Sequence, residues 1–215
     1  MIRALVFDFD GLILDTETPI VDAWVQVHVE AGLSCARQQA LDLIGEVDHS
    51  VDFWKAFGPD ADRSALEQKM RQIKKARIEG QDLLPGVRDR LIEAHRLGLT
   101  LAIASNSPHR WVDGHLQRLG LFEYFSTTRC RDDVARGKPE PDVYHAVLTA
   151  LGLEGREAIA FEDSSAGSLA AKRAGLRCVA VPNPCTHHHD FAHADLRATS
   201  LAELSLKNLV ARWAD

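Results

Sequence analysis

The sequence predicts an α/β protein with a doubly wound, mostly parallel Rossmann-like sheet and an inserted all-helical domain. Short apolar runs alternate with amphipathic helical patterns from residue 84 onward, as in sheets covered by helices on both faces. Another strand-like run opens the chain at residues 2–7, and residues 35–80 contain no convincing strand. Gly-Leu pairs, which suit helix C-termini, follow helical patterns at residues 32–33, 98–99, 120–121, 152–153 and 175–176.

The elements are expected in the following order. After the first strand, a helix is indicated by apolar residues at i, i+3, i+4 spacing, namely Ile20, Ala23, Trp24, Val27 and Ala31. Further helical patterns cover residues 36–44, 49–57, 62–78 and 87–97. The later strands are expected at residues 100–104, 124–128, 158–161, 178–181 and 196–198, and the helices at 109–119, 142–151, 166–174 and 201–213. We expect a core of residues 1–15 and 84–215 and a second, helical domain of residues 16–83.

Composition excludes several classes of function. The net charge of -6 gives neither a basic surface for nucleic acid nor a polybasic run for an anionic membrane. No apolar stretch has transmembrane length, and the N-terminus lacks a signal-peptide pattern. The four cysteines are scattered without CxxC spacing, so we expect free thiols in a reducing cytoplasm. The sequence predicts no particular oligomeric state.

Polar residues follow three of the expected strands, where ligands bind in open α/β sheets. Four carboxylates occur there: Asp8, Asp10, Glu162 and Asp163. Like charges about 4 Å apart repel by roughly 4 kcal/mol at an effective dielectric constant of 20, so convergence of these groups calls for a divalent cation. Hard oxygen ligands favour Mg²⁺. Ser105 before a helix start and Lys138 in a loop suit a phosphate group.

Four motifs together resemble those of haloacid dehalogenase superfamily hydrolases, within the β-phosphoglucomutase-like phosphatase branch. They are Asp8-Phe9-Asp10-Gly11 with Asp15, Ala104-Ser105-Asn106, Gly137-Lys138-Pro139, and Phe161-Glu162-Asp163-Ser164 with Ala166-Gly167. The resemblance covers nearly the whole chain, and the helical segment resembles the cap that such proteins insert after the first strand.

This resemblance implies a role for each motif residue. Asp8 would be the nucleophile that forms an aspartyl-phosphate, and Asp10 would be the general acid and base. Mg²⁺ would be held by Asp8, the backbone carbonyl of Asp10 and Asp163, with Glu162 as a further or indirect ligand. Ser105 and Lys138 would hold the transferring phosphoryl group, assisted by the backbone amides of Asn106 and Gly11.

The resemblance favours hydrolysis of a phosphate monoester over other reactions of the superfamily. Dehalogenases lack the second aspartate, and phosphonatases carry alanine there, so Asp10 argues against both. The alternative of a β-phosphoglucomutase-type mutase is disfavoured because its usual histidine is missing from residues 15–20, and its usual cap arginine is missing near residues 48–50. A catalytically silent protein that binds a ligand or partner is a third alternative, disfavoured by the intact motifs.

The substrate is expected to be a small phosphorylated metabolite of the sugar phosphate type, selected by the cap. Candidate residues of the cap and hinge are Asp15, Glu17 and His49, and Asp15 is also expected to brace its loop. Two other features are interpreted as solvated surface. One is the triplet His187-His188-His189, and the other is a basic cluster on a cap helix, Arg71, Lys74, Lys75 and Arg77.

Overall fold

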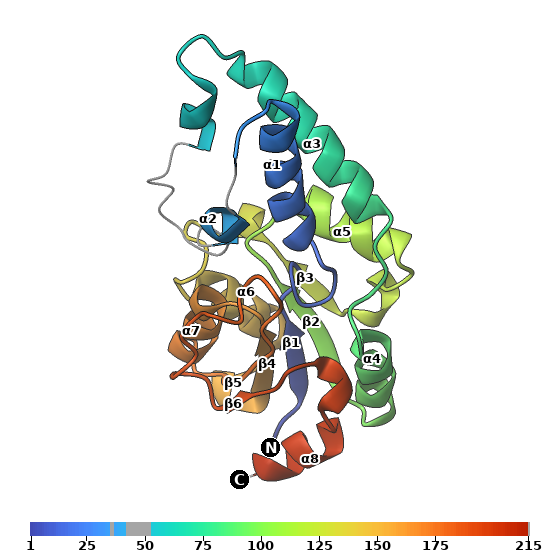
Figure 1. The fold of residues 1–215 in the computed structure, drawn as a ribbon. Helices are drawn as coiled ribbons and strands as arrows, with labels where there is room; N and C mark the ends of the chain where they lie inside the picture. The colour runs from blue at the N-terminus through green and yellow to red at the C-terminus, as the bar shows by residue number, and fades with distance from the viewer. Residues whose placement is uncertain (35–36, 42–52, 215) are drawn as a thin grey trace.

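The computed structural model describes residues 1–34, 37–41 and 53–214. Within these residues the strands form one parallel, six-stranded sheet in the order β3-β2-β1-β4-β5-β6 (Figure 1). The strands are β1 (Ala4–Phe7), β2 (Thr100–Ala104), β3 (Thr127–Arg129), β4 (Ala158–Glu162), β5 (Arg177–Ala180) and β6 (Leu196–Arg197). This arrangement confirms the predicted doubly wound α/β fold.

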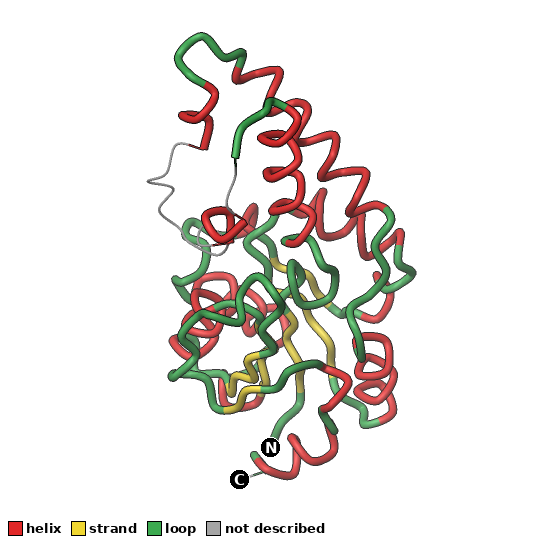
Figure 2. Tube along the Cα trace, viewed as in Figure 1, coloured by secondary structure: helices red, strands yellow, loops and turns green. Residues whose placement is uncertain are grey.

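In the described part of the chain, helices follow every strand except β5, which a loop joins to β6, and a further group of helices lies near the N-terminus (Figure 2). That group comprises α1 (Thr18–Glu30), α2 (Arg37–Leu41), the 3₁₀ helix η1 (Phe53–Phe57) and α3 (Arg63–Glu79). The remaining α-helices are α4 (Val87–Arg96), α5 (His109–Arg118), α6 (Asp142–Leu151), α7 (Ser165–Arg173) and α8 (Leu206–Arg212). Short 3₁₀ helices lie between them: η2 (Phe122–Tyr124), η3 (Arg131–Asp133), η4 (Gly155–Glu157) and η5 (Leu201–Glu203).

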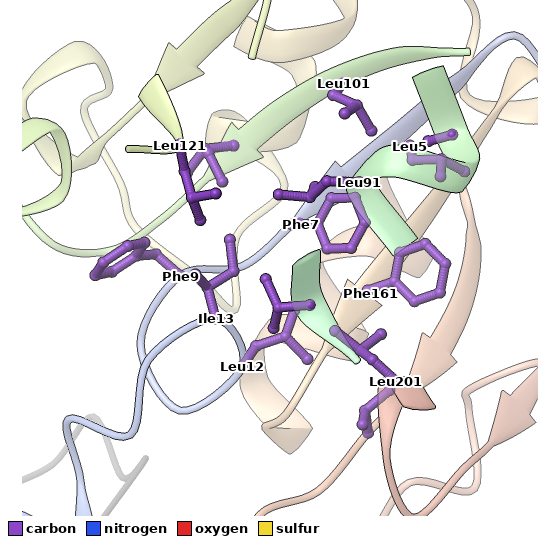
Figure 3. Packing of buried hydrophobic residues seen from close by; sticks show 14 of the residues in the cluster. Leu5, Phe7, Phe9, Leu12, Ile13, Leu91, Leu101, Leu121, Phe161 and Leu201 are labelled. Atoms are coloured by element: carbon purple, nitrogen blue, oxygen red, sulfur yellow. The ribbon is translucent and has the colours of Figure 1, made fainter. Parts of the chain in front are cut away.

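Alternating side chains of the strands build a core on each face of the sheet. On one face, Leu5 and Phe7 of β1 pack with buried residues of α4, α5 and α8, and Figure 3 shows Leu91 and Phe161 gathered near Phe7. The Phe7 and Phe161 rings stack with centroids 4.8 Å apart. On the other face, Ala4 and other small strand residues pack against α6 and α7. Because both faces are covered, successive strand side chains point into one core or the other, and polar groups are left to the strand ends.

Two sequence-based boundaries were wrong. The strand expected at residues 124–128 begins at Thr127, because the amides of Tyr124 and Phe125 bond within the η2 turn instead of to a neighbouring strand. The helix expected at residues 201–213 is two shorter helices, η5 and α8. Ser200 and Ser205 each accept a backbone amide at the start of one of them, so the chain has two N-caps and two helix starts.

The helices α1 and α3 lie side by side beyond the end of the sheet (Figure 1). Arg77 of α3 joins them by donating to Asp22 and Gln26 of α1, at 3.0 Å each. The two connections to the rest of the chain are themselves paired: Leu14 bridges Leu83, and the Leu84 amide donates to the Ile13 carbonyl at 3.0 Å. This pairing supports the division into core (1–15 and 84–215) and cap (16–83), which stays a prediction.

Other features of the described residues agree with their sequence-based interpretation. Cys130, Cys178 and Cys185 are buried free thiols, whereas Cys35 lies outside the described residues. His187 and His188 are exposed in the loop that follows β5. Among the helices described, none combines the length and the apolar character that crossing a bilayer requires.

Candidate active site

Three buried carboxylates meet where β1 and β4 end. These strands are neighbours with Phe7 paired to Phe161, so Asp8 and Glu162, the next residue on each strand, emerge side by side. Ligand oxygens of Asp8, Glu162 and Asp163 all lie within 4.8 Å of one another. The sequence-based expectation that these acidic residues converge is therefore met by the geometry of the parallel pair.

Lys138 enters this cluster from the loop before α6. Its ammonium group donates to Asp8 Oδ1 at 2.5 Å, to Glu162 Oε1 at 2.6 Å and to the Ala104 carbonyl at 2.7 Å. The Tyr144 hydroxyl of α6 donates to the same Glu162 oxygen. Burial lowers the pKa of Lys138, but the carboxylates of Asp8 and Glu162 outweigh burial and raise it, so the ammonium stays charged.

The charge balance of the cluster fits a divalent cation. One ammonium faces three carboxylates, which leaves two negative charges in a buried site. Burial, together with neighbouring carboxylates, raises the pKa of Asp8 and of Asp163 well above the ordinary value. Glu162 Oε2 is buried without a hydrogen-bond partner among the described residues. A hard cation bound to these oxygens would satisfy Glu162 Oε2 and keep the aspartates ionised.

Residues after β2 hold the loop that carries Lys138. The Lys138 amide donates to Asn106 Oδ1 at 2.8 Å, and Asn106 Nδ2 donates back to the Lys138 carbonyl at 3.2 Å. A Cβ on Gly137 would approach Asn106 Oδ1 to 2.6 Å, so this close pairing requires glycine. Ser105 is buried beside the site, and its hydroxyl accepts the Ser107 amide at 3.0 Å. Asn106 thus positions Lys138 through its side chain, and the predicted phosphate contacts of Ser105 and Asn106 stay predictions.

Asp10 lies at the same edge, but its carboxylate is directed toward α5. Ser107 Oγ donates to Asp10 Oδ2 at 2.6 Å, and the Trp111 indole donates to Asp10 Oδ1 at 2.8 Å. Its side chain is outside the group formed by Asp8, Glu162 and Asp163. A part for Asp10 in metal binding therefore rests on its backbone carbonyl, as the family resemblance implies.

Gly11 lets the first motif approach the carboxylate cluster closely. Its φ is +75°, and a Cβ there would come within 2.3 Å of Asp163 Oδ2 and 2.4 Å of Asn183 Nδ2. The Gly11 amide donates to the Leu14 carbonyl at 2.8 Å, which closes the loop after Asp10. A side chain at this position would displace Asp163, so glycine is needed for steric and backbone reasons.

Asn183 is a site residue that the sequence analysis missed. It is buried in the loop after β5, and its Nδ2 lies 2.8 Å from Asp163 Oδ2, 2.8 Å from Glu17 Oε2 and 3.1 Å from the Gly11 carbonyl. Its position directly after a strand, between Pro182 and Pro184, was the available signal. Asn183 thus connects a predicted metal ligand to the start of the helical segment.

The predicted cap and hinge candidates have different surroundings. Burial and the charges of Asp10 and Asp15 raise the pKa of Glu17 to about 7, despite the hydrogen bond from Asn183. Asp15 accepts the Thr18 amide at 3.0 Å at the start of α1, and its predicted role of bracing its own loop stays a prediction. His49 lies outside the described residues.

A cleft of about 1170 Å³ opens over the cluster, between the sheet edge and the helices of the N-terminal group. Its walls from that group include Thr16, Glu17, Ile20, Trp24, Ala40, Trp54, Met70 and Lys74. Its walls from the rest of the chain include Asp8, Asp10, Ser105, Trp111, Lys138 and Asp163. Lys74, part of the basic cluster interpreted as solvated surface, lines this cleft, and its Nζ lies 5.8 Å from the centroid of the Trp111 ring.

Comparison with known proteins finds a matching family model and several similar relatives. A family model described as haloacid dehalogenase-like hydrolase matches residues 5–181. YhcW of Bacillus subtilis (strain 168), named as a phosphatase, is 39% identical over 217 residues, covering 98% of this chain and 97% of the relative. Hexitol phosphatase B of Escherichia coli (strain K12) is 34% identical over 216 residues, covering 97% of each chain.

A solved structure of similar fold is that of CbbY from Rhodobacter sphaeroides in complex with phosphate. It superposes with a TM-score of 0.74 at 30% sequence identity, and the match covers 95% of this chain and 97% of that one. The family resemblance inferred from the four motifs is confirmed by the family model and by these relatives. The chain belongs to the haloacid dehalogenase-like hydrolase family.

Proposed function

We propose that this protein is a Mg²⁺-dependent phosphatase that hydrolyses a small phosphorylated metabolite through an aspartyl-phosphate on Asp8. The observation that carries the proposal is the buried set of Asp8, Glu162, Asp163 and Lys138 at the floor of the cleft. Three carboxylates and one ammonium suit a dication and a phosphoryl dianion together. The names of the relatives support the same chemistry.

In the first step, a carboxylate oxygen of Asp8 bonds to phosphorus while the bond from phosphorus to the ester oxygen breaks. The Asp10 carboxyl group, protonated at the start of this step, gives its proton to the departing alkoxide. In the second step, water attacks the phosphorus of the aspartyl-phosphate, and the Asp10 carboxylate takes the proton of that water. Asp8 is regenerated and inorganic phosphate leaves. Lys138 and Ser105 bind the oxygens of the transferring group throughout.

Mg²⁺ bound to Asp8, Asp163 and Glu162 would offset the repulsion between the nucleophile and the substrate phosphate. The fit of these residues to the ion rests on the unpartnered Glu162 oxygen and on the two net negative charges. Asn183 and Tyr144 hold two of these carboxylates in place by hydrogen bonds to Asp163 and Glu162.

A phosphorylated sugar or sugar alcohol is the substrate class we propose. Hexitol phosphatase B, at 34% identity over nearly the full chain, supports this class. The cleft combines indole rings of Trp24 and Trp54 with polar groups such as Glu17, which suits a molecule with apolar C–H faces and many hydroxyls. The cytoplasmic location remains a prediction from the sequence.

The test is phosphate release from a panel of hexose, pentose and hexitol phosphates, with p-nitrophenyl phosphate as a general substrate. Activity should require Mg²⁺, disappear with EDTA and disappear in Asp8→Asn, which leaves the size of the side chain unchanged. Asp60→Asn, in the exposed turn before α3, is the matched control and should keep full activity. Turnover by Asp8→Asn at the wild-type rate would contradict the proposed nucleophile.

Mutase activity is tested in the same preparation. Hydrolysis should proceed without a sugar bisphosphate activator, because an Asp8-bound phosphoryl group passes to water. Isomerisation of β-glucose 1-phosphate that depends on glucose 1,6-bisphosphate would instead favour a β-phosphoglucomutase.

A further inference from the structure

We propose that Trp111, together with Ser107, is a positioning residue that holds the Asp10 carboxylate for proton transfer to the leaving group. This inference rests on the proposed function, because it takes Asp10 as the general acid. The observation behind it is that each carboxylate oxygen of Asp10 has its own donor. The Trp111 indole lies 2.8 Å from Oδ1, and Ser107 Oγ lies 2.6 Å from Oδ2.

Both donors belong to a rigid part of the fold. Trp111 lies in the first turn of α5, where its amide donates to the Pro108 carbonyl at 2.9 Å. Val112 and Leu116 of the same helix are fully buried in the core beside the sheet. The Trp111 ring contacts His115 one helical turn on, with ring centroids 4.4 Å apart. The indole N–H is therefore held in place by the helix and cannot follow Asp10 if that side chain turns away.

The hydrogen bonds from Ser107 and Trp111 favour one side-chain orientation of Asp10, whereas an aspartate on a loop can otherwise adopt several. Two donors at the two oxygens hold the carboxylate in one plane, so its position relative to Asp8 is set by α5 through Trp111 and by the turn before α5 through Ser107. Placement of an acid matters for catalysis, because a displacement of about 1 Å can cost roughly 100-fold in rate. The positioning is supplied by a segment about 100 residues away in the sequence, as the separations of 97 and 101 residues show.

Trp111 also has a contact from the helical segment that covers the cleft. Lys74 Nζ of α3 lies 5.8 Å from the centroid of the Trp111 ring, within the range of a cation–π interaction. Both side chains line the cleft. Contacts from Lys74 through Trp111 to Asp10 thus join the predicted cap to the predicted acid. Lys74 supports the ring orientation in which the Trp111 indole N–H bonds to Asp10.

The experiment compares two substrates of similar shape whose leaving groups differ in their need for a proton. The p-nitrophenolate ion leaves readily without protonation, whereas phenolate is more basic and gains more from an acid. The value of kcat/KM reports the steps up to leaving-group departure, so the ratio between p-nitrophenyl phosphate and phenyl phosphate measures proton donation. We would measure this ratio for the wild type, Trp111→Phe, Ser107→Ala and Asp10→Asn.

Trp111→Phe keeps a ring but removes the indole N–H. We expect kcat/KM for phenyl phosphate to fall about 10-fold to 100-fold, and that for p-nitrophenyl phosphate to fall less than about threefold. Ser107→Ala should show the same pattern, and it serves as the second route if Trp111→Phe does not fold. Lys74→Met should shift the ratio in the same direction by less. Trp213→Phe, at the end of α8 and outside the cleft lining, is the matched tryptophan control and should leave the ratio unchanged.

The outcomes separate this inference from the proposed function. If Asp10→Asn changes the ratio but neither Trp111→Phe nor Ser107→Ala does, the positioning role is wrong and the acid assignment stands. If Asp10→Asn lowers both substrates equally, Asp10 is not the acid and the proposed function itself must be revised. An unchanged ratio of kcat/KM values in Lys74→Met would show that the predicted cap does not help to position Asp10.

Discussion

Two backbone hydrogen bonds fix the orientation of the Asn183 side chain, which lies beside the candidate metal ligand Asp163. Its Oδ1 accepts the backbone amides of Cys185 and Thr186, at 2.7 and 3.2 Å, so its Nδ2 must face Asp163 and Glu17. An amide held in this way orients the Asp163 carboxylate through its hydrogen bond to Oδ2, as hydrogen-bond partners of metal ligands commonly do.

Replacing this amide tests its influence on metal binding. Asn183→Leu keeps a similar volume but removes the hydrogen bond to Asp163, and we expect Mg²⁺ affinity to fall about 10-fold to 100-fold. Isothermal titration calorimetry of Mg²⁺ into the purified protein measures this directly. Asn208→Leu, at an exposed position on α8, is the matched control. Equal affinity in Asn183→Leu and the wild type would show that Asn183 does not orient the ligand.

His109 forms a second charged cluster at the residue scale, apart from the carboxylates of the metal site. Its ring nitrogens lie 2.9 Å from Asp113 on the same helix and 2.8 Å from Asp133 of η3, and its amide donates to Asp132. Burial lowers the pKa of His109, but hydrogen bonds and charges of Asp133 and Asp113 outweigh it and raise the pKa above the ordinary 6.5.

The sign of this shift gives a pH dependence. Because the folded pKa is raised, His109 contributes stability fully below about pH 6.5, and that contribution is lost as the pH rises through the folded pKa. Urea unfolding should therefore show a difference between the wild type and His109→Asn that is larger at about pH 6 than at about pH 9. His95→Asn, exposed on α4, is the control. A difference that grows with pH would contradict the assignment.

At the scale of elements, the junction between α4 and η5 depends on the absence of one side chain. Gly86 precedes α4 with φ of +86°, and a Cβ there would lie 2.2 Å from the Ala202 amide nitrogen. Gly98, after the same helix, also has a positive φ of +69°, but a Cβ there would meet nothing within 4 Å. Both positions favour glycine because of their positive φ, but only Gly86 also lacks space for a side chain.

This pair of glycines gives a matched prediction. Gly98→Ala should lower the free energy of unfolding by about 1–2 kcal/mol, the cost of a left-handed alanine. Gly86→Ala should lower it by about 2–5 kcal/mol, because overpacking against η5 adds to that cost. Urea-induced unfolding of both variants measures the difference. Equal losses would mean that η5 yields to the added methyl group without cost.

At the scale of the whole molecule, a bound cation should stabilise the fold, because three carboxyl groups at the floor of the cleft outnumber the one ammonium that faces them. A ligand that binds the folded state alone stabilises it by mass action, by about 2.7 kcal/mol at a concentration of 100 Kd. For a chain of this length, that corresponds to a rise in Tm of roughly 5–10 °C.

We therefore expect saturating Mg²⁺ to raise Tm by roughly 5–10 °C and EDTA to reverse the rise. Asp163→Asn should abolish the shift while remaining folded, and KCl at matched ionic strength controls for screening. Differential scanning fluorimetry is sufficient for the comparison. A shift of equal size in Asp163→Asn and the wild type would place the ion elsewhere.

Much of the fold and of the site could be predicted from the sequence because the relevant signals are local. Apolar runs such as residues 4–7 and 158–161 predict strands by their own composition, and the polar residue after each predicts the site edge. Asp8 and Asp163 were found in this way, and the parallel pairing of β1 with β4 brings them together. Lys138 was found in a loop, between Gly137 and Pro139. The missed boundaries at Thr127 and Leu206 depend on turns whose hydrogen bonds have no periodic pattern.

By itself, the sequence determined the α/β class, the motif residues and the family, because strand-forming composition and motif spacing lie within short segments. Only the tertiary structure showed that Asn183 bonds to Asp163, that Tyr144 bonds to Glu162, and that Trp111 bonds to Asp10. Each of these contacts joins residues far apart in the chain, and single hydrogen bonds between distant segments leave no periodicity in composition. The fold brings them within bonding distance, and so it decides how the predicted site residues are held.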